Sequence, residues 1–461
     1  MKRLIKFTVA NFDEENISRT ELLQLIMKHQ TIASHMETLE AYYRGDHNIL
    51  NRSRTKGAPN NKIIVNYAKY VTDTLTGYFM GNPVTYDNTA DADIEPLLKA
   101  FDVAHVDDAD ADNVFEASQN GIAFEYVYVA EGETDLKVKN LCSQSTFMIY
   151  DTSIEEKEVA AVYYRVLHDD VTDRVYYVAT VCTQHYIYEM SLWDSTDVAP
   201  VPDSKRPHFF GEVPVICYQN GHECIGDYEQ LIPLIDAGDV VMSDRVNDVN
   251  EFVDSILVIY GTLLSDDGEE GNAKTSLKDG KLLEFPDKQT MGAEWLTRQL
   301  DENGVEVLQK SIRQQILAMA NVPDFSDENF ASNSSGVAIA YKILMMEWLT
   351  KTKERYYRIG LRKRIRLFCR FLGLKQILLD SDSIVPHFTR SLPTNQLETA
   401  QMVTMLEGTV SKRTLLTLLP FVEDPDAELE AVQKEEEEKM KAQMALFSMR
   451  QNTPPEDEDT E

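Results

Sequence analysis

The sequence predicts an α+β fold that is mainly helical, with one antiparallel β region among the helices. Three observations lead to this class. Apolar residues recur at helical spacing over most of the chain, whereas short β-branched and aromatic runs separated by turn residues replace them between residues 121 and 219. The chain has 461 residues, of which 43% are hydrophobic and 26% charged, so it has the composition of a folded protein and the length of two or three domains.

The first elements are expected to be helices. Residues 1–60 are interpreted as a helical arm, because apolar residues follow a helical period over 19–43. Residues 52–61 are rich in Arg, Lys, Gly, Pro and Asn, a composition typical of a loop. A second helix is predicted over 64–79, and the Gly-Asn-Pro sequence that starts at residue 81 ends it.

The middle of the chain is expected to form strands. Its β-branched and aromatic runs are bounded by turn clusters such as His168-Asp169-Asp170, which is the pattern of an antiparallel meander. A further strand is predicted at 213–218. The runs of the meander are residues 122–129, 147–150, 159–167, 175–181 and 186–190.

Helical periodicity returns after residue 231. One long helix is predicted over 231–260 and another over 305–320, where Val322-Pro323 ends it. Between them, residues 262–303 lack a period and contain short apolar runs at 282–285 and 295–296. A second long helical pattern covers 337–372, with Gly360 in its middle as a place where the helix can kink. Further helices are expected at 395–419 and 423–451, and residues 452–461 are expected to be disordered.

The charge balance of the chain argues against one class of function. With 45 basic and 77 acidic residues, the formal charge is −32. This argues against a protein whose whole surface binds nucleic acid, since such affinity comes mostly from Lys and Arg that neutralise phosphates, but not against one that DNA slides past. No apolar run reaches the ~18 residues of a membrane span, and acidic residues follow the basic N-terminus where a signal peptide is apolar. We therefore expect a protein that is cytosolic at synthesis and contacts no membrane.

No catalytic signature is found in the sequence. The common phosphate-binding, dinucleotide-binding, hydrolase and zinc motifs are absent, and the many adjacent acidic pairs are better explained as solvated surface. The five cysteines are scattered, and Cys217 and Cys224 do not match a zinc spacing. We expect no enzyme, no catalytic residues, no cofactor and no metal.

Three segments together resemble the portal proteins of tailed bacteriophages, in particular the siphophage-type family of phages and prophages of Gram-positive bacteria. They are NKIIVNYAKYVTDTLTGYFMGNPV at 61–84, the segment from Leu234 to Gly261 containing NDVNEFVDSILVIYG, and VPDFSDENFASNSSGVAIAYK at 322–342. Their order and spacing over nearly 300 residues, followed by an acidic helical C-terminus, make the match specific. One departure is Ser332, at a position where the family often has Gly.

The resemblance implies a homo-oligomeric ring, usually of twelve subunits, at the portal vertex of the virion capsid. Double-stranded DNA would pass through it, without sequence specificity, during packaging and ejection. The implied partners are the terminase motor, the major capsid protein and scaffold, and the head-completion or tail adaptor proteins. Assembly would take place in the host cytoplasm. The rival interpretations are a DNA-processing enzyme of the packaging machinery and a monomeric capsid adaptor or scaffold.

The resemblance also implies a division of the chain into portal parts. After the arm, the implied order is wing, first stem helix, clip, second stem helix, tunnel loop, long wing helix with the remainder of the wing, crown helices and an acidic tail. The corresponding ranges are 61–230, 231–261, 262–303, 304–320, 321–336, 337–394, 395–451 and 452–461.

Three groups of site residues follow from this division. The tunnel loop would present short polar groups and one glycine to DNA, the stem helix would present acids to the passage, and an acidic run in the clip would be a docking surface. The loop residues are Ser326, Asn333, Ser334, Ser335 and Gly336; the wall residues are Asp236, Asp244, Asp248, Glu251 and Asp254; the clip residues are Asp266, Asp267, Glu269 and Glu270.

A local reversal of charge stands out over residues 351–375, where ten basic residues occur with Glu354 as the lone acid. One interpretation is that these cations pair with acidic surface of the same or an adjacent subunit. The other is that they contact packaged DNA or the capsid. We favour the first.

Overall fold

The computed structural model describes residues 6–253, apart from 10, 11, 16, 56, 57, 91, 170, 172 and 194–203. It also describes 256–260, 282–285, 292–296, 302–325 and 336–390, and then 401, 403–406, 408, 410–417, 422, 428–429, 431–434 and 440. The chain divides into two compact units. One is Met1–Ser332 with Tyr341–Ser391, and the other is Asn333–Ala340 with Leu392–Glu461.

The first unit begins with the predicted helices. Helix α1 spans Arg19–Arg44, where Ser18 caps its start by accepting a hydrogen bond from the Glu21 amide and Gly45, at φ 92°, ends it. The short helix η1 (Asn48–Asn51) follows. Helix α2 spans Tyr67–Met80 and starts later than the predicted residue 64, because Asn66 caps it and the residues before it are extended. Two helices that the sequence analysis did not identify come next, α3 (Glu95–Ala104) and α4 (Val106–Asn120).

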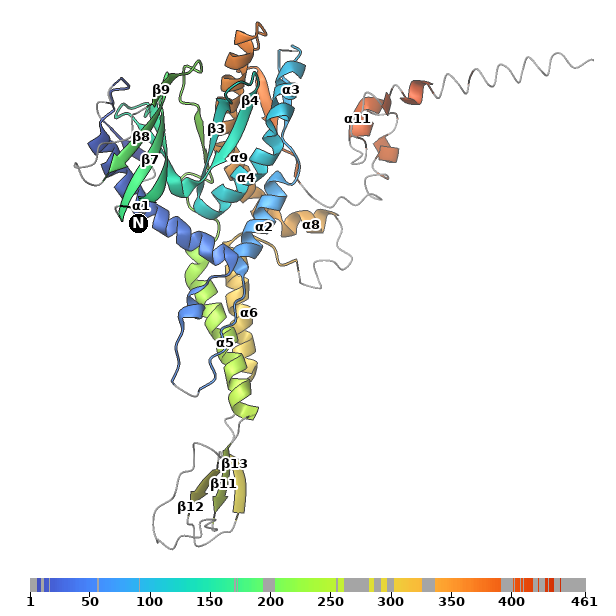
Figure 1. Cartoon of the computed structure of the whole chain (residues 1–461). Helices are drawn as coiled ribbons and strands as arrows, with labels where there is room; N and C mark the ends of the chain where they lie inside the picture. The colour runs from blue at the N-terminus through green and yellow to red at the C-terminus, as the bar shows by residue number, and fades with distance from the viewer. Residues whose placement is uncertain are drawn as a thin grey trace, which may run out of the picture. The chain divides into compact units, whose positions relative to one another are not determined.

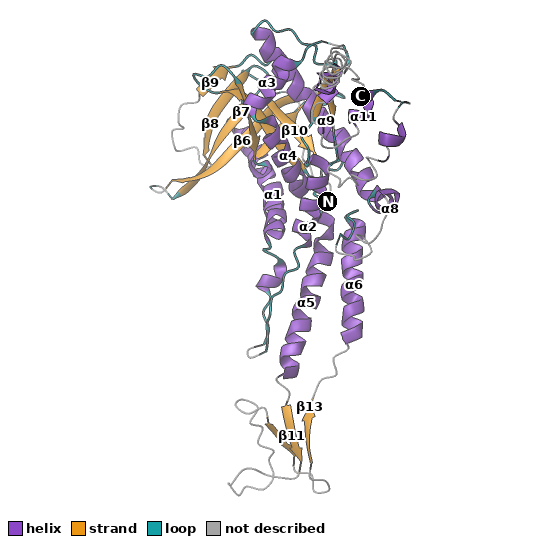
Figure 2. Cartoon of the chain, turned by 90° about the vertical axis from the view of Figure 1, so that its right-hand side faces the viewer, coloured by secondary structure: helices purple, strands orange, loops and turns teal. Residues whose placement is uncertain are grey.

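Most of the predicted meander forms a six-stranded sheet (Figures 1 and 2). Strand β1 pairs in parallel with β5, and the other neighbours in the order β1-β5-β6-β7-β8-β9 are antiparallel. Phe7, Leu22, Ile26 and Phe147 belong to the core that joins α1 to this sheet. The strands are Lys6–Thr8, Thr146–Tyr150, Glu158–Asp169, Arg174–Cys182, Tyr186–Trp193 and Ser204–Pro207.

Residues 122–129 do not belong to that meander, which corrects the prediction. Strand β3 (Ile122–Val129) pairs instead with β10 (Val215–Gln219) on one side and β4 (Leu136–Leu141) on the other. Its first four residues are buried on both faces, so their apolar run does not reveal which sheet they join. A two-stranded sheet of β2 (Thr85–Asn88) and β14 (Ile384–His387) completes this part.

Helix α9 (Leu344–Leu374) packs against the β10-β3-β4 sheet around a buried cation. The guanidinium of Arg364 is fully buried; it donates to Glu125 and forms a second ion pair with Asp110 at 2.6 Å. Tyr357, two helical turns before Arg364, donates to Asp110 at 2.6 Å and stacks on Tyr218. Buried charges are tolerated when they are paired in this way, so the network sets how α9 sits on α4 and the sheet.

The predicted helix over 337–372 is interrupted, which corrects its extent. Helix α8 spans Gly336–Lys342, and α9 begins at Leu344 after Ile343. Gly360 lies within the continuous helix α9. There its missing side chain allows a close approach, because a Cβ atom would lie 2.4 Å from the Tyr218 ring.

Helices α5 (Ile232–Val253) and α6 (Glu302–Met319) lie side by side, as both views show (Figures 1 and 2). The predicted helix over 231–260 is therefore too long. The β-branched run Ile256–Tyr260 is strand β11, which pairs with β12 (Leu282–Phe285) and β13 (Gly292–Leu296). In the second unit, α11 spans Lys412–Thr417, and the rest of the predicted C-terminal helices lies mostly outside the described residues.

Candidate functional site: the α5–α6 pair and the segment along α5

Three buried polar side chains of α5 hold an extended segment of the chain. Asp239 accepts the backbone N–H of Val65 at 2.8 Å, and Ser243 accepts that of Ile63 at 2.9 Å. Asn247 accepts both the backbone N–H of Asn61 and its side-chain N–H, at 2.8 and 2.9 Å. All three side chains are completely buried. We call this set the α5 ladder.

The spacing of the α5 ladder follows from the geometry of a helix beside an extended chain. Four residues of a helix advance ~6.0 Å, and two residues of an extended chain advance roughly 6.6 Å. Positions 239, 243 and 247 of the helix therefore lie opposite positions 65, 63 and 61, respectively, of a segment that runs antiparallel to the helix. The sequence analysis missed this set, although the four-residue spacing of Asp, Ser and Asn on one helix face was a usable signal.

The same helix carries two of the acids predicted to face the passage. Asp236 accepts hydrogen bonds from Tyr42 at 2.6 Å and from Asn48 at 3.0 Å. Asp244 forms ion pairs with Arg52, at 2.6 Å, and with Arg54. Each of these two acids is thus bound to the segment between α1 and α2 within one chain.

A buried ion pair connects this segment to the α5 ladder. The Nδ1 atom of His47 lies 2.5 Å from Asp239, and its Nε2 atom lies 3.0 Å from the carbonyl oxygen of Tyr42. Both neighbours are acceptors, so both ring nitrogens donate and His47 is the imidazolium. Burial by itself lowers the pKa of His47, but the hydrogen bond and charge of Asp239 outweigh it and raise that pKa above its usual value.

The base of the α5–α6 pair is anchored in a hydrophobic core with α1, α2 and α9. Its members include Leu39, Leu75, Ile235 and Ile316. Polar contacts add to it: Arg245 donates to Gln309 at 3.0 Å, and Arg313 pairs with Asp324 at 2.7 Å.

The three segments that carry the portal resemblance meet at this base. The α5 ladder joins 61–65 to α5, and Tyr70 in α2 donates to the carbonyl of Pro323 at 3.3 Å. Segments far apart in the sequence therefore form one structural site, which is the junction of the α5–α6 pair with the rest of the first unit.

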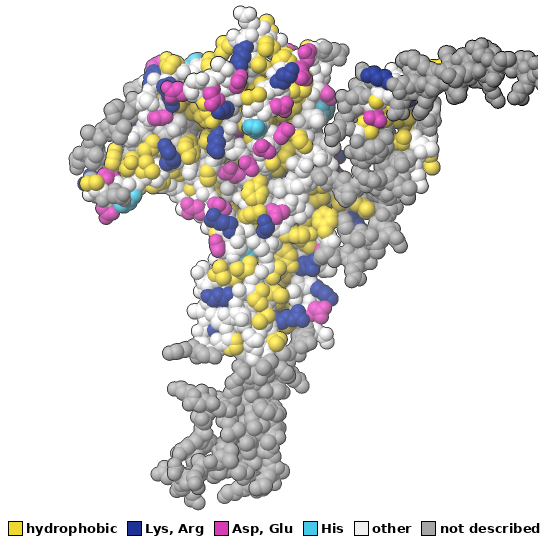
Figure 3. Space-filling model, turned by 45° about the vertical axis from the view of Figure 1, so that its right-hand side comes forward, with side chains coloured by type: hydrophobic (Ala, Val, Ile, Leu, Met, Phe, Trp, Pro, Cys, Tyr) yellow, Lys and Arg dark blue, Asp and Glu magenta, His cyan; other side chains and the backbone are white. Residues whose placement is uncertain are grey.

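Both helices also carry exposed apolar side chains. Figure 3 shows hydrophobic side chains gathered over the α5–α6 pair. Solvent-exposed apolar residues in this number on two adjacent helices are typical of a surface that another protein covers. They are Val240 and Val249 on α5 and Val307, Leu308 and Met319 on α6.

The remaining predicted site residues are not brought together by the described structure. Asp248 lies on α5 and is half-buried; Glu251 lies near the end of α5, and Gly336 is the first residue of α8. The others lie outside the described residues: Asp254, Asp266, Asp267, Glu269, Glu270, Ser326, Asn333, Ser334 and Ser335.

The basic run on α9 is largely paired with acids of the same chain, which confirms the interpretation favoured from the sequence. Lys353 pairs with Asp227, and Lys363 with Glu158. Arg366 and Arg370 both pair with Glu212, at 3.2 and 2.7 Å. On the helix itself, Lys351 and Arg358 pair with Glu347 and Glu354, and Lys375 pairs with Asp135.

The described residues contain no group of three or more His, Cys, Asp or Glu side chains that could hold a metal ion. Within the same residues, none of the helices combines the length and the apolar character needed to cross a bilayer.

Comparison with known proteins gives a consistent match. The family model described as phage portal protein, SPP1 Gp6-like, matches residues 22–442. The protein of Bacillus phage SPP1 named portal protein is 23% identical over 397 residues, which cover 82% of this chain and 76% of the relative. The portal protein of Clostridium phage phiCD119 is 22% identical over 382 residues, with 79% and 82% of the two chains covered.

Two solved structures are also similar to this chain, though distantly. One is the neck of an empty GTA particle computed with C6 symmetry, at 11% identity and a TM-score of 0.43, covering 77% of this chain and 90% of that chain. The other is the virion of a native gene transfer agent particle, at 10% identity and a TM-score of 0.41, covering 84% and 93%.

Proposed function

The chain belongs to the SPP1 Gp6-like family of phage portal proteins, and on that premise we propose that its α5–α6 pairs surround the passage through which viral double-stranded DNA enters and leaves the capsid. A portal protein is a ring-forming component of the capsid vertex, and its family is structural rather than enzymatic. The observation that carries the proposal is the family match over residues 22–442, which includes the whole α5–α6 pair.

The properties of the pair support this role. Its exposed apolar residues on both helices suit contact with the pairs of neighbouring copies, since every copy in a ring presents one face to each neighbour. The net charge of −32 per chain suits a wall past which DNA slides, because a basic wall would bind each phosphate and stall the strand. The α5 ladder would keep the pair fixed to the rest of the first unit while DNA moves.

The finer assignments are part of the same proposal. The ring contains twelve copies, residues 321–336 form the loop nearest to DNA, and residues 262–303 form a clip on which the terminase motor and the adaptor proteins dock. The wing, residues 61–230, contacts the major capsid protein and scaffold, and residues 395–451 form the crown. Rings assemble in the host cytoplasm and act without catalysis of their own. No observation on the described residues favours a DNA-processing enzyme or a monomeric adaptor.

A charge placed in the proposed loop tests the passage. Ser334→Arg would add one cation per copy around the DNA, so rings should assemble normally but package less DNA, and higher salt should ease the defect. DNase-protected DNA in assembled particles is the measurement. Ser153→Arg, the same change at an exposed turn between β5 and β6, is the control and should package normally. Normal packaging by the Ser334→Arg ring would remove this loop from the passage.

A further inference from the structure

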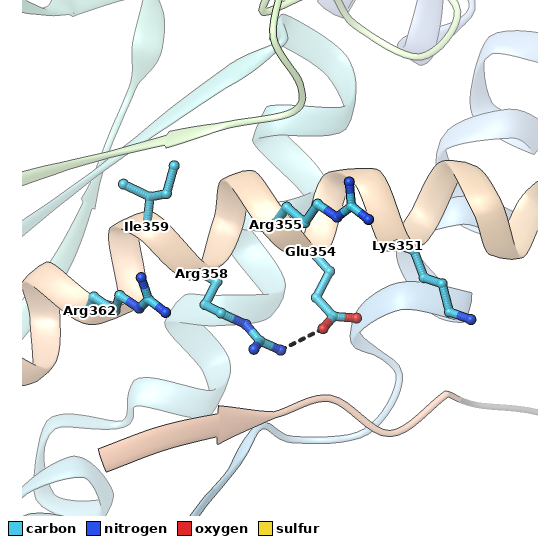
Figure 4. A pocket seen from close by; sticks show the side chains of 6 residues that line it. All are labelled: Lys351, Glu354, Arg355, Arg358, Ile359 and Arg362. Carbon is cyan, nitrogen blue, oxygen red and sulfur yellow. Dashed lines mark hydrogen bonds and ion pairs between the residues drawn. The ribbon is translucent and has the colours of Figure 1, made fainter. Parts of the chain in front are cut away.

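The outward face of α9 carries both cations and exposed apolar side chains. Met345, Trp348 and Ile359 are 55%, 56% and 63% exposed, and Arg355 and Arg362 are exposed beside them. Successive members are three, four or seven residues apart, and these spacings place all five on one face of the helix. Figure 4 shows Arg355 and Ile359 projecting from the same side of α9, where they line a groove with Arg362. We call these five residues the α9 ridge.

Arg355 and Arg362 differ from the other cations of this helix. Every other Lys or Arg between residues 351 and 375 has a carboxylate partner in the chain. Within the part of the chain that the structure describes, Arg355 and Arg362 form no ion pair. Two uncompensated arginines in a chain of net charge −32 indicate a surface that attracts an acidic partner.

The chemistry of the α9 ridge fits a protein better than DNA. Phosphates would neutralise the arginines but would leave Trp348, Met345 and Ile359 in water, whereas a protein surface can cover both kinds of side chain. Glu347 and Glu354 also lie along this helix, and Glu354 lines the same groove. Both carboxylates are already paired, with Lys351, Arg358 and Arg390, so Arg355 and Arg362 are the charges of this face that a partner would have to match.

A complementary surface exists on the same chain. Asp102, Asp107, Asp108 and Asp112 are exposed where α3 meets α4, around Val103, which is 55% exposed. None of the four acids forms an ion pair within the described residues. Partial burial, and then the nearby charges of Asp110 and Asp102, raise the pKa of Asp107, and they outweigh the opposing charge of the buried Arg364. We call these four acids and Val103 the acidic corner.

The two surfaces lie on opposite sides of one layer. The inward face of α4 contacts the inward face of α9, because Asp110 accepts from Tyr357 at 2.6 Å and pairs with Arg364. On α4, Asp108 and Asp112 are roughly half a helical turn away from Asp110, and on α9, Arg355 and Ile359 are roughly half a turn away from Tyr357. One surface therefore faces away from α4, and the other faces away from α9.

We propose that the α9 ridge of one copy docks on the acidic corner of the next copy in the ring. The proposal rests on the ring stated above and identifies a contact within it. A ring of identical chains needs two different, complementary surfaces on each copy, arranged so that the contact repeats head to tail. The α9 ridge and the acidic corner meet this requirement in charge, in apolar content and in their placement on opposite sides of a layer.

Charge reversal tests the contact in the full chain. The variant Arg355→Glu with Arg362→Glu should lower the population of rings by about tenfold or more, since like charges brought together at an interface repel. Asp108→Lys with Asp112→Lys should do the same. The chain that carries all four changes should recover ring formation, because the opposite charges face each other again. Mass photometry gives the ring population, and circular dichroism with thermal unfolding establishes that each variant is folded.

The control reverses two exposed cations elsewhere, Lys28→Glu with Lys139→Glu, which gives the same change in net charge and should leave the rings intact. Rings of normal abundance in the Arg355→Glu, Arg362→Glu variant, with or without a defect in DNA packaging, would overturn the proposal while the portal function stands. Loss of rings without recovery in the fourfold variant would overturn it as well. If the unaltered chain forms no ring under any condition, the portal function itself fails.

Discussion

Gly360 sets how closely α9 approaches the β10-β3-β4 sheet. A Cβ atom there would lie 2.4 and 2.5 Å from two carbons of the Tyr218 ring, which is itself fully buried and stacked on Tyr357 at 4.5 Å between ring centres. The sequence shows the glycine and suggests a kink, but it cannot show the ring from a distant strand that makes glycine necessary.

Gly360→Ala should therefore destabilise the protein. In an exposed helix the same change stabilises by about 1 kcal/mol, but forcing a methyl group into a packed core costs about 1–3 kcal/mol, so the free energy of unfolding should fall. Gly373→Ala on the same helix is the control, because nothing lies within 4 Å of its Cβ position. Equal effects of the two changes in chemical denaturation would show that Tyr218 does not constrain α9.

The buried side chain of His29 should make the free energy of unfolding depend on pH. It is buried between α1 and the six-stranded sheet, 2.9 Å from the hydroxyl of Tyr164, and burial lowers its pKa to about 4. Because the unfolded chain binds this proton near pH 6.5 and the folded chain does not, stability contributed by neutral His29 is present above pH 6.5 and is lost as pH falls toward 4. His47 acts in the opposite direction, since its raised pKa contributes stability that is lost as pH rises.

His29→Gln should flatten the acid side of the stability profile. Between pH 6.5 and 4 the free energy of unfolding of the unaltered protein should fall by about 3 kcal/mol more than that of the variant. This figure corresponds to a pKa lowered by about 2.5 units. The readout is the free energy of unfolding in urea at a series of pH values, at fixed salt. His222→Gln, at an exposed position, is the control and should leave the profile unchanged. Parallel profiles for the two variants would contradict the assignment of the acid limb to His29.

At the scale of elements, the sequence predicts helices well where a cap and a period agree. The first long helix was predicted over 19–43 and is α1, because its apolar period is bounded by Ser18 and Gly45. The helix predicted over 231–260 is too long. The apolar run Ile256–Tyr260 fits either a buried helix or a strand, and its strand partners β12 and β13 are separate segments of the chain. The assignment of residues 122–129 to the meander was wrong for the same reason, since their partner strand β10 is far away in the sequence.

The candidate site was predicted only in outline. The acids on α5 could be recognised from the sequence. Their partners could not, because Asp236 and Asp244 bind residues 42–54, a contact that depends on the path of the chain between α1 and α2. The reversal of charge on α9 could be recognised from composition alone, and pairing with acids of the same chain was the correct interpretation for most of it. Which acids pair with it depends on tertiary contacts.

Removing one member of the α5 ladder should loosen the segment that it holds. Asn247→Leu keeps the size of the side chain but removes the oxygen that accepts two hydrogen bonds from Asn61, so the free energy of unfolding should fall by about 1–3 kcal/mol. Amide hydrogen exchange should speed up at Asn61 and Ile63 and remain unchanged in the six-stranded sheet. Asn250→Leu, one turn further along α5 at an exposed position, is the control. Unchanged exchange at Asn61 in the Asn247→Leu variant would mean that the ladder does not hold the segment.

At the scale of the whole molecule, the exposed apolar residues of α5 and α6 and those of the α9 ridge have a common explanation. A single chain leaves them in water, whereas in the proposed ring the next copy would cover them. The large negative charge works against assembly through repulsion between copies, so ring formation should become easier as salt screens it. The contacts that close the ring must therefore be apolar or must pair unlike charges locally.

Cryo-electron microscopy of the purified chain tests the central claim most directly. If the protein forms a portal ring, the particles should be closed rings of about twelve copies of the 52.5 kDa chain, with α5–α6 pairs around an open centre wide enough for a DNA duplex to pass. Particles that remain single 52.5 kDa chains at every salt and protein concentration, or rings in which the α5–α6 pairs lie on the outer rim, would contradict it.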